Sequence, residues 1–137
     1  MLADAGADVD HDSQMVRLDR GLVMDRIAQA PSEFRLHARN PEKNLRVGGR
    51  HLFFTSVGGP AYCSDLDRGR RRGSFEESCD YIRLVQSLDI IHQEGGGPFE
   101  PIELPPETRH LDLYHAQIRL LDKNWQPIAL GADRTRD

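Results

Sequence analysis

The run HLFFTSVGGP at residues 51–60 is a short apolar segment that ends in two glycines and a proline. Such a run is typical of a strand that is buried on both faces, as in a parallel sheet. The run LDIIHQEGGG at residues 88–97 has the same form, and PIALG at residues 127–131 is a third example. We therefore expect strands at residues 52–57, 90–93 and 127–130, each followed by glycine.

Two helical patterns separate these three runs. SFEE at residues 74–77 matches a capping box, in which the Ser74 hydroxyl and the Glu77 carboxylate each accept a hydrogen bond from the other residue's amide. A second helix is expected from PPE at residues 105–107, because proline is favoured at the start of a helix. Both segments continue with an apolar stripe at helical spacing: Phe75, Cys79, Ile82, Val85 and Leu88 in the first, and Leu111, Tyr114, Ile118 and Leu121 in the second.

The order strand, helix, strand, helix, strand predicts parallel strands that are joined by right-handed crossovers. A doubly wound sheet and a (β/α)8 barrel both have this order, and a complete barrel needs about 250 residues. We expect an α/β fold in which residues 51–137 are the first part of a (β/α)8 barrel, with three parallel strands and two helices. The chain ends where a third helix should follow, so we expect it to be truncated at the C-terminus.

Residues 1–50 have a different pattern, which predicts a small α+β extension. Two short extended pieces flank the polar residues 10–14, and a helix is expected over residues 19–30 because apolar residues recur there at helical spacing before Pro31. Alternating residues at 34–39 and 45–47, with turn residues at 40–44 between them, predict a hairpin.

Composition excludes several classes of protein. The 137 residues are 38% hydrophobic and 29% charged, with a net charge of -4, which argues against disorder and against a general nucleic-acid binder. No apolar stretch approaches the ~20 residues of a membrane helix, and residues 1–8 carry acids where a signal peptide carries lysine or arginine, so we expect a cytoplasmic protein without membrane contact. Cys63 and Cys79 have no spacing typical of a disulfide framework or a zinc site, and the basic run RGRRR at residues 68–72 is expected to be an exposed loop.

The candidate site lies at the carboxyl ends of the expected strands, where both architectures bind ligands. Each strand ends in glycine, which allows a ligand to approach the backbone closely. The sequence has neither GxGxxG nor a phosphate-binding loop at these positions, which disfavours phosphate binding there. The candidate glycines are Gly58, Gly59, Gly95, Gly96 and Gly131.

Four other residues near the strand ends are candidates for the site. His92 can act as a hydrogen-bond partner or an acid/base, although a structural role is the alternative. Glu94 can face a cationic substrate, and Tyr62 and Phe99 can form pocket walls that attract a quaternary ammonium group through cation–π interaction. Histidines 110 and 115 lie on an expected outer helix, where surface or interhelical contacts are the simpler interpretation, so no metal site is expected.

Five short motifs resemble the trimethylamine methyltransferase family. They occur in order across about residues 34–121, and their combination is far more specific than any one of them. The motifs are HARNP at 37–41, VGGP at 57–60, DLDRGRR at 65–71, IHQEGG at 91–96 and ETRHLD at 107–112.

The resemblance implies a barrel methyltransferase that moves a methyl group from a methylated amine to the Co(I) corrinoid of a separate partner protein, as in methanogenesis or methylamine catabolism. Trimethylamine or a quaternary amine such as glycine betaine would be the substrate, and the pyrrolysine of some members belongs to a later part of the barrel. The whole enzyme is expected to be a homo-oligomer that binds neither nucleic acid nor membrane. This chain is expected to be an incomplete part of it, inactive by itself. The alternatives are another barrel enzyme, a lyase or aldolase, and a small α/β module that binds an anion.

Overall fold

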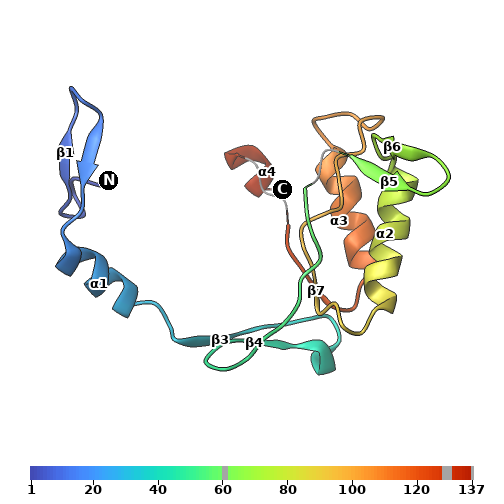
Figure 1. The fold of residues 1–137 in the computed structure, drawn as a ribbon, viewed down its shortest axis with the longest axis horizontal. Coiled ribbons are helices and arrows are strands. Elements are labelled where there is room, and N and C mark those ends of the chain that lie inside the picture. Colours follow the sequence, from blue (N-terminus) through green and yellow to red (C-terminus); the bar gives the residue numbers. More distant parts are fainter. Residues whose placement is uncertain (60–61, 128–130, 137) are drawn as a thin grey trace. The chain divides into compact units, whose positions relative to one another are not determined.

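A computed structural model describes residues 1–59, 62–127 and 131–136 (Figure 1). The chain forms two compact units, residues 1–34 and residues 35–137. The sequence pattern places a boundary near residue 50 instead. The hairpin before residue 50 belongs to the second unit because its turn is bonded to Asp122. The Asn40 amide donates to the Asp122 carbonyl, and Lys43 forms an ion pair with the Asp122 carboxylate at 2.6 Å.

The first unit contains two short strands and one helix. β1 (Asp8–Asp10) and β2 (Met15–Arg17) pair antiparallel, and α1 (Arg20–Ala28) follows them. The Asp19 carboxylate caps α1 by accepting from the amides of Gly21 and Leu22. The two extended pieces and the helix that the sequence predicts are thus confirmed. No residue of this unit, which the structure describes completely, is buried.

A two-stranded sheet follows, formed by β3 (Glu33–Leu36) and β4 (Leu45–Gly48). A 3-10 helix, η1 (Pro41–Lys43), lies in the connection between the two strands. It begins at Asn40, whose side chain accepts from the Glu42 amide. The predicted hairpin over residues 34–47 is therefore confirmed.

The core of the second unit lies between α2 (Phe75–Ser87) and α3 (Arg109–Leu120), which pack side by side (Figure 1). Its buried apolar residues are Ile82, Val85, Ala116 and Leu121. The capping box at Ser74 is confirmed, because both of its hydrogen bonds are present. α3 begins at Arg109, a little later than the prolines at 105 and 106 suggest. None of the helices in the described residues is long and apolar enough to span a membrane.

Three segments of the second unit pair in parallel. β7 (Gln93–Glu94) pairs with β8 (Asn124–Trp125), and on its other side Gln93 forms a parallel bridge with Thr55. The first expected strand, 52–57, is reduced to this bridge, and β8 lies just before the third expected strand, 127–130. Residues 128–130 lie outside the described residues. The parallel sense agrees with the expected order, and the barrel itself stays a prediction.

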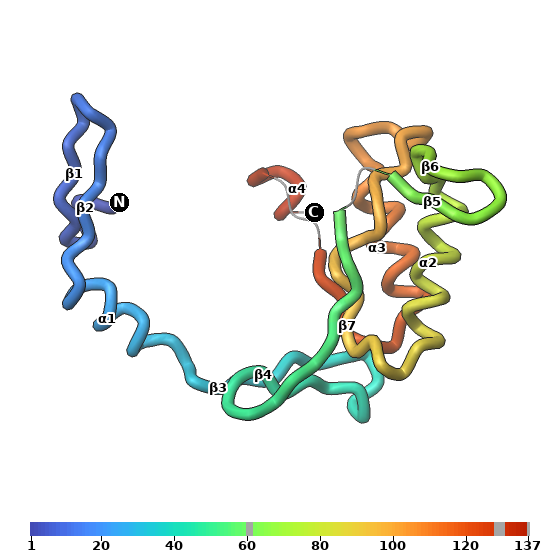
Figure 2. The backbone as a smooth tube through the Cα atoms, viewed as in Figure 1, coloured from blue at the N-terminus to red at the C-terminus, as the bar shows by residue number. Residues whose placement is uncertain are grey.

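A hairpin that the sequence analysis did not predict precedes α2. β5 (Cys63–Asp65) and β6 (Gly69–Arg71) pair antiparallel, so the basic run at 68–72 is partly a strand and not simply an exposed loop (Figure 2). Gly69 has a φ of 65°, and the Asp65 carboxylate accepts from the amides at 67 and 68, which closes the turn. The run is largely exposed, as expected, but it is not a loop, because Arg68 and Arg71 are held by Asp65 of β5 and by Glu77 of α2, and the second partner could not be identified from the run alone.

Two carboxylates hold this hairpin together and against α2. Arg71 bonds to both Asp65 and Glu77, and Arg68 bonds to the same pair at 3.1 and 2.9 Å. The Arg71 guanidinium, with the Ser74 amide, lowers the pKa of Glu77 to about 2. The Arg68 amide, with the Arg71 side chain, lowers the pKa of Asp65 to about 2. Both groups are therefore charged at neutral pH.

Candidate functional site

The turn after β7 is built around the carboxylate of Glu94, which is 0% exposed. Its Oε1 accepts from the Gly97 amide at 2.8 Å, and its Oε2 accepts from the Gly96 amide at 3.1 Å and from Gln117 Nε2 at 2.7 Å. Gly96 and Gly97 have φ values of 102° and 88°, a conformation that favours glycine. Three donors compensate the buried charge, so Glu94 fixes this turn against α3.

The glycines at the ends of the first two expected strands lie against each other. A Cβ on Gly58 would be 1.9 Å from the Gly95 carbonyl oxygen, and a Cβ on Gly95 would be 2.0 Å from the Ser56 oxygen. The Gly59 amide donates to the Gly97 carbonyl at 2.9 Å. The structure thus brings Gly58, Gly59, Gly95 and Gly96 together, and close backbone approach explains two of them. Their role in binding a substrate stays a prediction.

His92 is half-buried and contacts the preceding strand. Its Nδ1 accepts from the Phe54 amide at 3.1 Å, and its own amide donates to the Phe54 carbonyl at 2.9 Å. The two rings stack with centroids 6.2 Å apart. Since Nδ1 is engaged, only Nε2 is left for contact with a substrate. The catalytic role of His92 is untested and stays a prediction.

The other three predicted site residues are Phe99, Tyr62 and Gly131, and their role in binding stays a prediction. Phe99 is 5% exposed and packs on Gly73, so its ring lies in the interior of the unit. Tyr62 is exposed, with the Arg70 guanidinium 4.0 Å from its ring centroid. Gly131 has a φ of 90° and precedes α4 (Ala132–Arg136). Among the described residues, neither Tyr62 nor Gly131 bonds to the glycines at 58–59 and 95–97.

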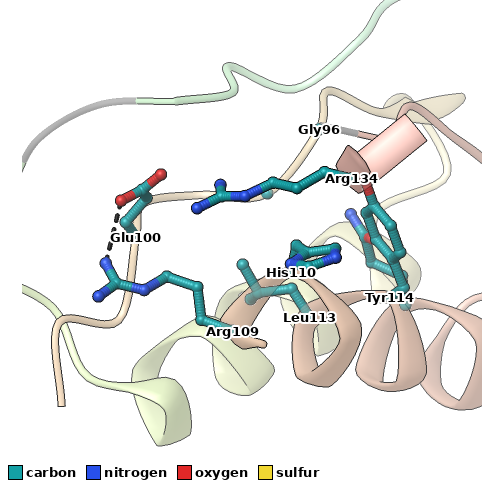
Figure 3. Close-up of a pocket in the computed structure, with 9 residues that line it drawn as sticks. Gly96, Glu100, Arg109, His110, Leu113, Tyr114 and Arg134 are labelled. Atoms are coloured by element: carbon teal, nitrogen blue, oxygen red, sulfur yellow. Dashed lines mark hydrogen bonds and ion pairs between the residues drawn. The ribbon is translucent and has the colours of Figure 1, made fainter. Parts of the chain in front are cut away.

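A small pocket, which encloses about 10 Å³, lies between the Glu94 turn and α3 (Figure 3). One face of α3 forms much of it, and Arg134 of α4 extends across it from the other side. The Arg109 guanidinium bonds to Glu100 at 3.0 Å and to the Leu104 carbonyl at 3.0 Å. The lining residues from α3 are Arg109, His110, Leu113, Tyr114 and Gln117.

The sequence analysis missed most of this pocket. His110 is 3% exposed and lines it, so it is not a surface residue, whereas His115 is exposed as expected. The signal was present: Arg109, Leu113 and Gln117 recur every four residues, which places two polar residues on one face with an apolar one. Among the described residues, no group of three or more side chains is arranged to hold a metal ion.

Comparison with known proteins identifies the family. All residues, 1–137, match the family described as trimethylamine methyltransferase. The chain is 32% identical over 126 residues to the glycine betaine methyltransferase of Desulfitobacterium hafniense strain Y51, a match that covers 92% of this chain and 26% of that protein. It is 27% identical over 90 residues to the trimethylamine methyltransferase MttB of Desulfitobacterium hafniense strain DSM 10664 / DCB-2, covering 65% of this chain and 18% of that protein.

The chain belongs to the trimethylamine methyltransferase family. It spans about a quarter of the length of the glycine betaine methyltransferase that it matches. The resemblance inferred from the five motifs is confirmed, and the interpretation as a lyase or aldolase is set aside.

Proposed function

We propose that this chain is part of a cytoplasmic methyltransferase that transfers a methyl group from a methylated amine to the Co(I) corrinoid of a partner protein. The observation that carries the proposal is the family match along all 137 residues, together with relatives that are named for glycine betaine and for trimethylamine. The amine is trimethylamine or a quaternary amine such as glycine betaine.

The proposed reaction requires little acid/base catalysis by the protein. The bond from nitrogen to the methyl carbon breaks while the carbon bonds to the nucleophile, and the nitrogen keeps the electron pair. A quaternary amine such as glycine betaine then leaves as a neutral tertiary amine, whereas trimethylamine has to carry a proton on nitrogen to leave as neutral dimethylamine. A Co(I) corrinoid supplies the nucleophile, and the protein binds and orients the amine. A site formed by backbone groups and glycines fits this reaction, because the protein mainly has to position the amine and little proton transfer is needed.

The proposed place for this reaction is the group of glycines at 58, 59, 95 and 96, called the glycine cluster below. It lies at the carboxyl ends of parallel segments, where barrels and open α/β sheets bind ligands. A Cβ on Gly59 would meet none of the described residues within 4 Å, so the backbone is open to approach at this glycine. We propose that Nε2 of His92 contacts the amine at this edge. We also propose that the second unit is the first part of a (β/α)8 barrel.

A chimera tests the proposal. This chain replaces the matched segment of the glycine betaine methyltransferase of strain Y51, and the product is mixed with a Co(I) corrinoid protein and either glycine betaine or trimethylamine. Formation of methyl-cobalt, followed by absorbance, is the expected result. The unmodified relative is the positive control, and omission of the amine is the negative control. A folded chimera that methylates no corrinoid with either amine would contradict the proposed function.

A further inference from the structure

The β5–β6 hairpin contains a basic run whose role the proposed reaction does not explain. Residues 62–72 carry four arginines against two aspartates, in a chain with a net charge of -4. Asp65 and Glu77 form ion pairs with the arginines at 68 and 71. The other two, Arg70 and Arg72, are exposed and have no part in these ion pairs. A short segment of an acidic chain therefore presents positive charge to solvent.

The two strands turn one face toward α2 and the other face away from it. Arg71 and its cross-strand partner Cys63 both bond to Glu77, so their side chains lie toward α2 (Figure 2). Successive side chains of a strand point to opposite faces, so Arg70 points away from α2. Its guanidinium lies 4.0 Å from the ring centroid of Tyr62, which is exposed.

The exposed side chains of the hairpin are of the types that dominate protein interfaces. Arginine and tyrosine supply much of the binding energy in such interfaces, and Arg70, Arg72 and Tyr62 are available for contact. Leu66, at the turn, is fully exposed, although turn geometry does not require an apolar residue there. Asp67 is the remaining carboxylate of residues 62–72, so the exposed arginines outnumber it. We expect this surface to attract an acidic protein more than a basic one.

The hairpin is already ordered without a partner. A two-stranded hairpin by itself is at best marginally stable in water. Here the ion pairs of Arg68 and Arg71 attach the hairpin to α2, and the Asp65 carboxylate closes the turn by accepting from two backbone amides. A surface that is ordered in advance loses little conformational freedom on binding, which favours its use in docking.

We propose that the exposed residues of this hairpin, Tyr62, Leu66, Arg70 and Arg72, dock an acidic face of the corrinoid protein. The inference rests on the proposed function, because there the methyl group passes from the amine to cobalt on a second protein. Tyr62 follows Gly59 by three residues, so their Cα atoms are at most about 11 Å apart. A protein bound to the hairpin therefore lies beside the glycine cluster, where the reaction is proposed.

Methyl transfer by the chimera tests the docking surface when the concentration of the corrinoid protein is varied. Arg70→Gln combined with Arg72→Gln should raise the KM for the corrinoid protein by about tenfold or more, because two complementary charges are lost. The KM for the amine should stay unchanged, since neither arginine belongs to the glycine cluster. Arg35→Gln combined with Arg50→Gln is the matched control, because both residues are exposed and lie outside the hairpin. Circular dichroism shows whether all variants are folded.

A binding measurement separates this proposal from the proposed function. The 137-residue chain is immobilised, and binding of the same corrinoid protein is followed by biolayer interferometry without any amine. We expect binding that weakens as salt is added, because exposed charges are screened, and that weakens by about tenfold or more in the Arg70/Arg72 double variant. If the chimera transfers no methyl group but this binding pattern is found, the proposed function fails and the docking surface stands.

Four results overturn the docking surface. They are an unchanged KM for the corrinoid protein in the Arg70/Arg72 double variant, equal effects of the two double variants, no binding of the corrinoid protein to the parent chain, and tighter binding of a single-stranded oligonucleotide than of the corrinoid protein. The first two, found with an active chimera, leave the proposed function intact.

Discussion

Replacing Lys123 with methionine tests how the end of α2 is held. Lys123 is 4% exposed, and its Nζ donates to the carbonyl oxygens of Val85, Leu88 and Ile91 at 2.8, 2.7 and 2.8 Å. The Val85 carbonyl lies in the last turn of α2, the Leu88 carbonyl caps the helix and also accepts from the Ile91 amide, and the Ile91 carbonyl precedes β7. One ammonium group therefore joins the end of α2 to the segment before β7. Methionine keeps the approximate length and removes all three donors.

The expected cost follows from the burial of these acceptors. The hydrogen bond from Lys123 to the Val85 carbonyl is buried, so a carbonyl left without this donor costs about 1–3 kcal/mol of folding free energy. The Leu88 and Ile91 carbonyls are partly exposed, so water replaces the lysine and each loss costs about 0.5–1 kcal/mol. The three losses together come to about 2–5 kcal/mol. Burial lowers the pKa of Lys123, so removing the ammonium group also removes a desolvation cost, which offsets part of this loss. In a unit of about 100 residues this lowers Tm by on the order of 10–20 °C.

Urea and thermal unfolding, followed by circular dichroism, measure this loss. Lys43→Met is the matched control, because Lys43 pairs with Asp122 at 2.6 Å while both side chains remain about a third exposed. That substitution should cost less than about 1 kcal/mol. Equal losses for the two variants, or an unchanged urea midpoint for Lys123→Met, would refute the reasoning.

Three further predictions concern the hairpin and the glycine turn. Since the pKa values of Asp65 and Glu77 are lowered to about 2, both carboxylates stabilise the fold above about pH 5, and this contribution is lost as the pH falls toward about 2. The urea midpoint should therefore fall over this pH range, and Glu77→Gln should make it depend less on pH. Gly95→Ala places a methyl group 2.0 Å from a backbone oxygen and should cost at least about 2 kcal/mol in urea unfolding, while Gly59→Asn, at a φ of 73° with open space, should cost under about 1 kcal/mol. Glu94→Gln presents an amide N–H to a backbone donor and should lower the free energy of unfolding by about 1–3 kcal/mol; a stable variant would mean that the carboxylate does not fix the turn.

The sequence alone determined the elements whose causes are local. The capping box at Ser74, the aspartate cap of α1 and the turn at Asn40 each depend on bonds between residues two or three positions apart. The order of apolar runs and helices likewise predicted the parallel sense of the segments at Thr55, β7 and β8. Short-range chemistry of this kind is visible in any window of the chain.

Only the tertiary structure decided which residues meet across long separations. The pairing of β8 at 124–125 was not predicted, because its register is set by β7, some 30 residues away. The arginines at 68 and 71 are held by Glu77 in the following helix, so the basic run does not behave as a free loop. Arg109 and Gln117 line the pocket because one face of α3 lies against the Glu94 turn. The role of a polar side chain on a buried helix face depends on the group that the fold places opposite it, and the sequence of the helix does not contain that group.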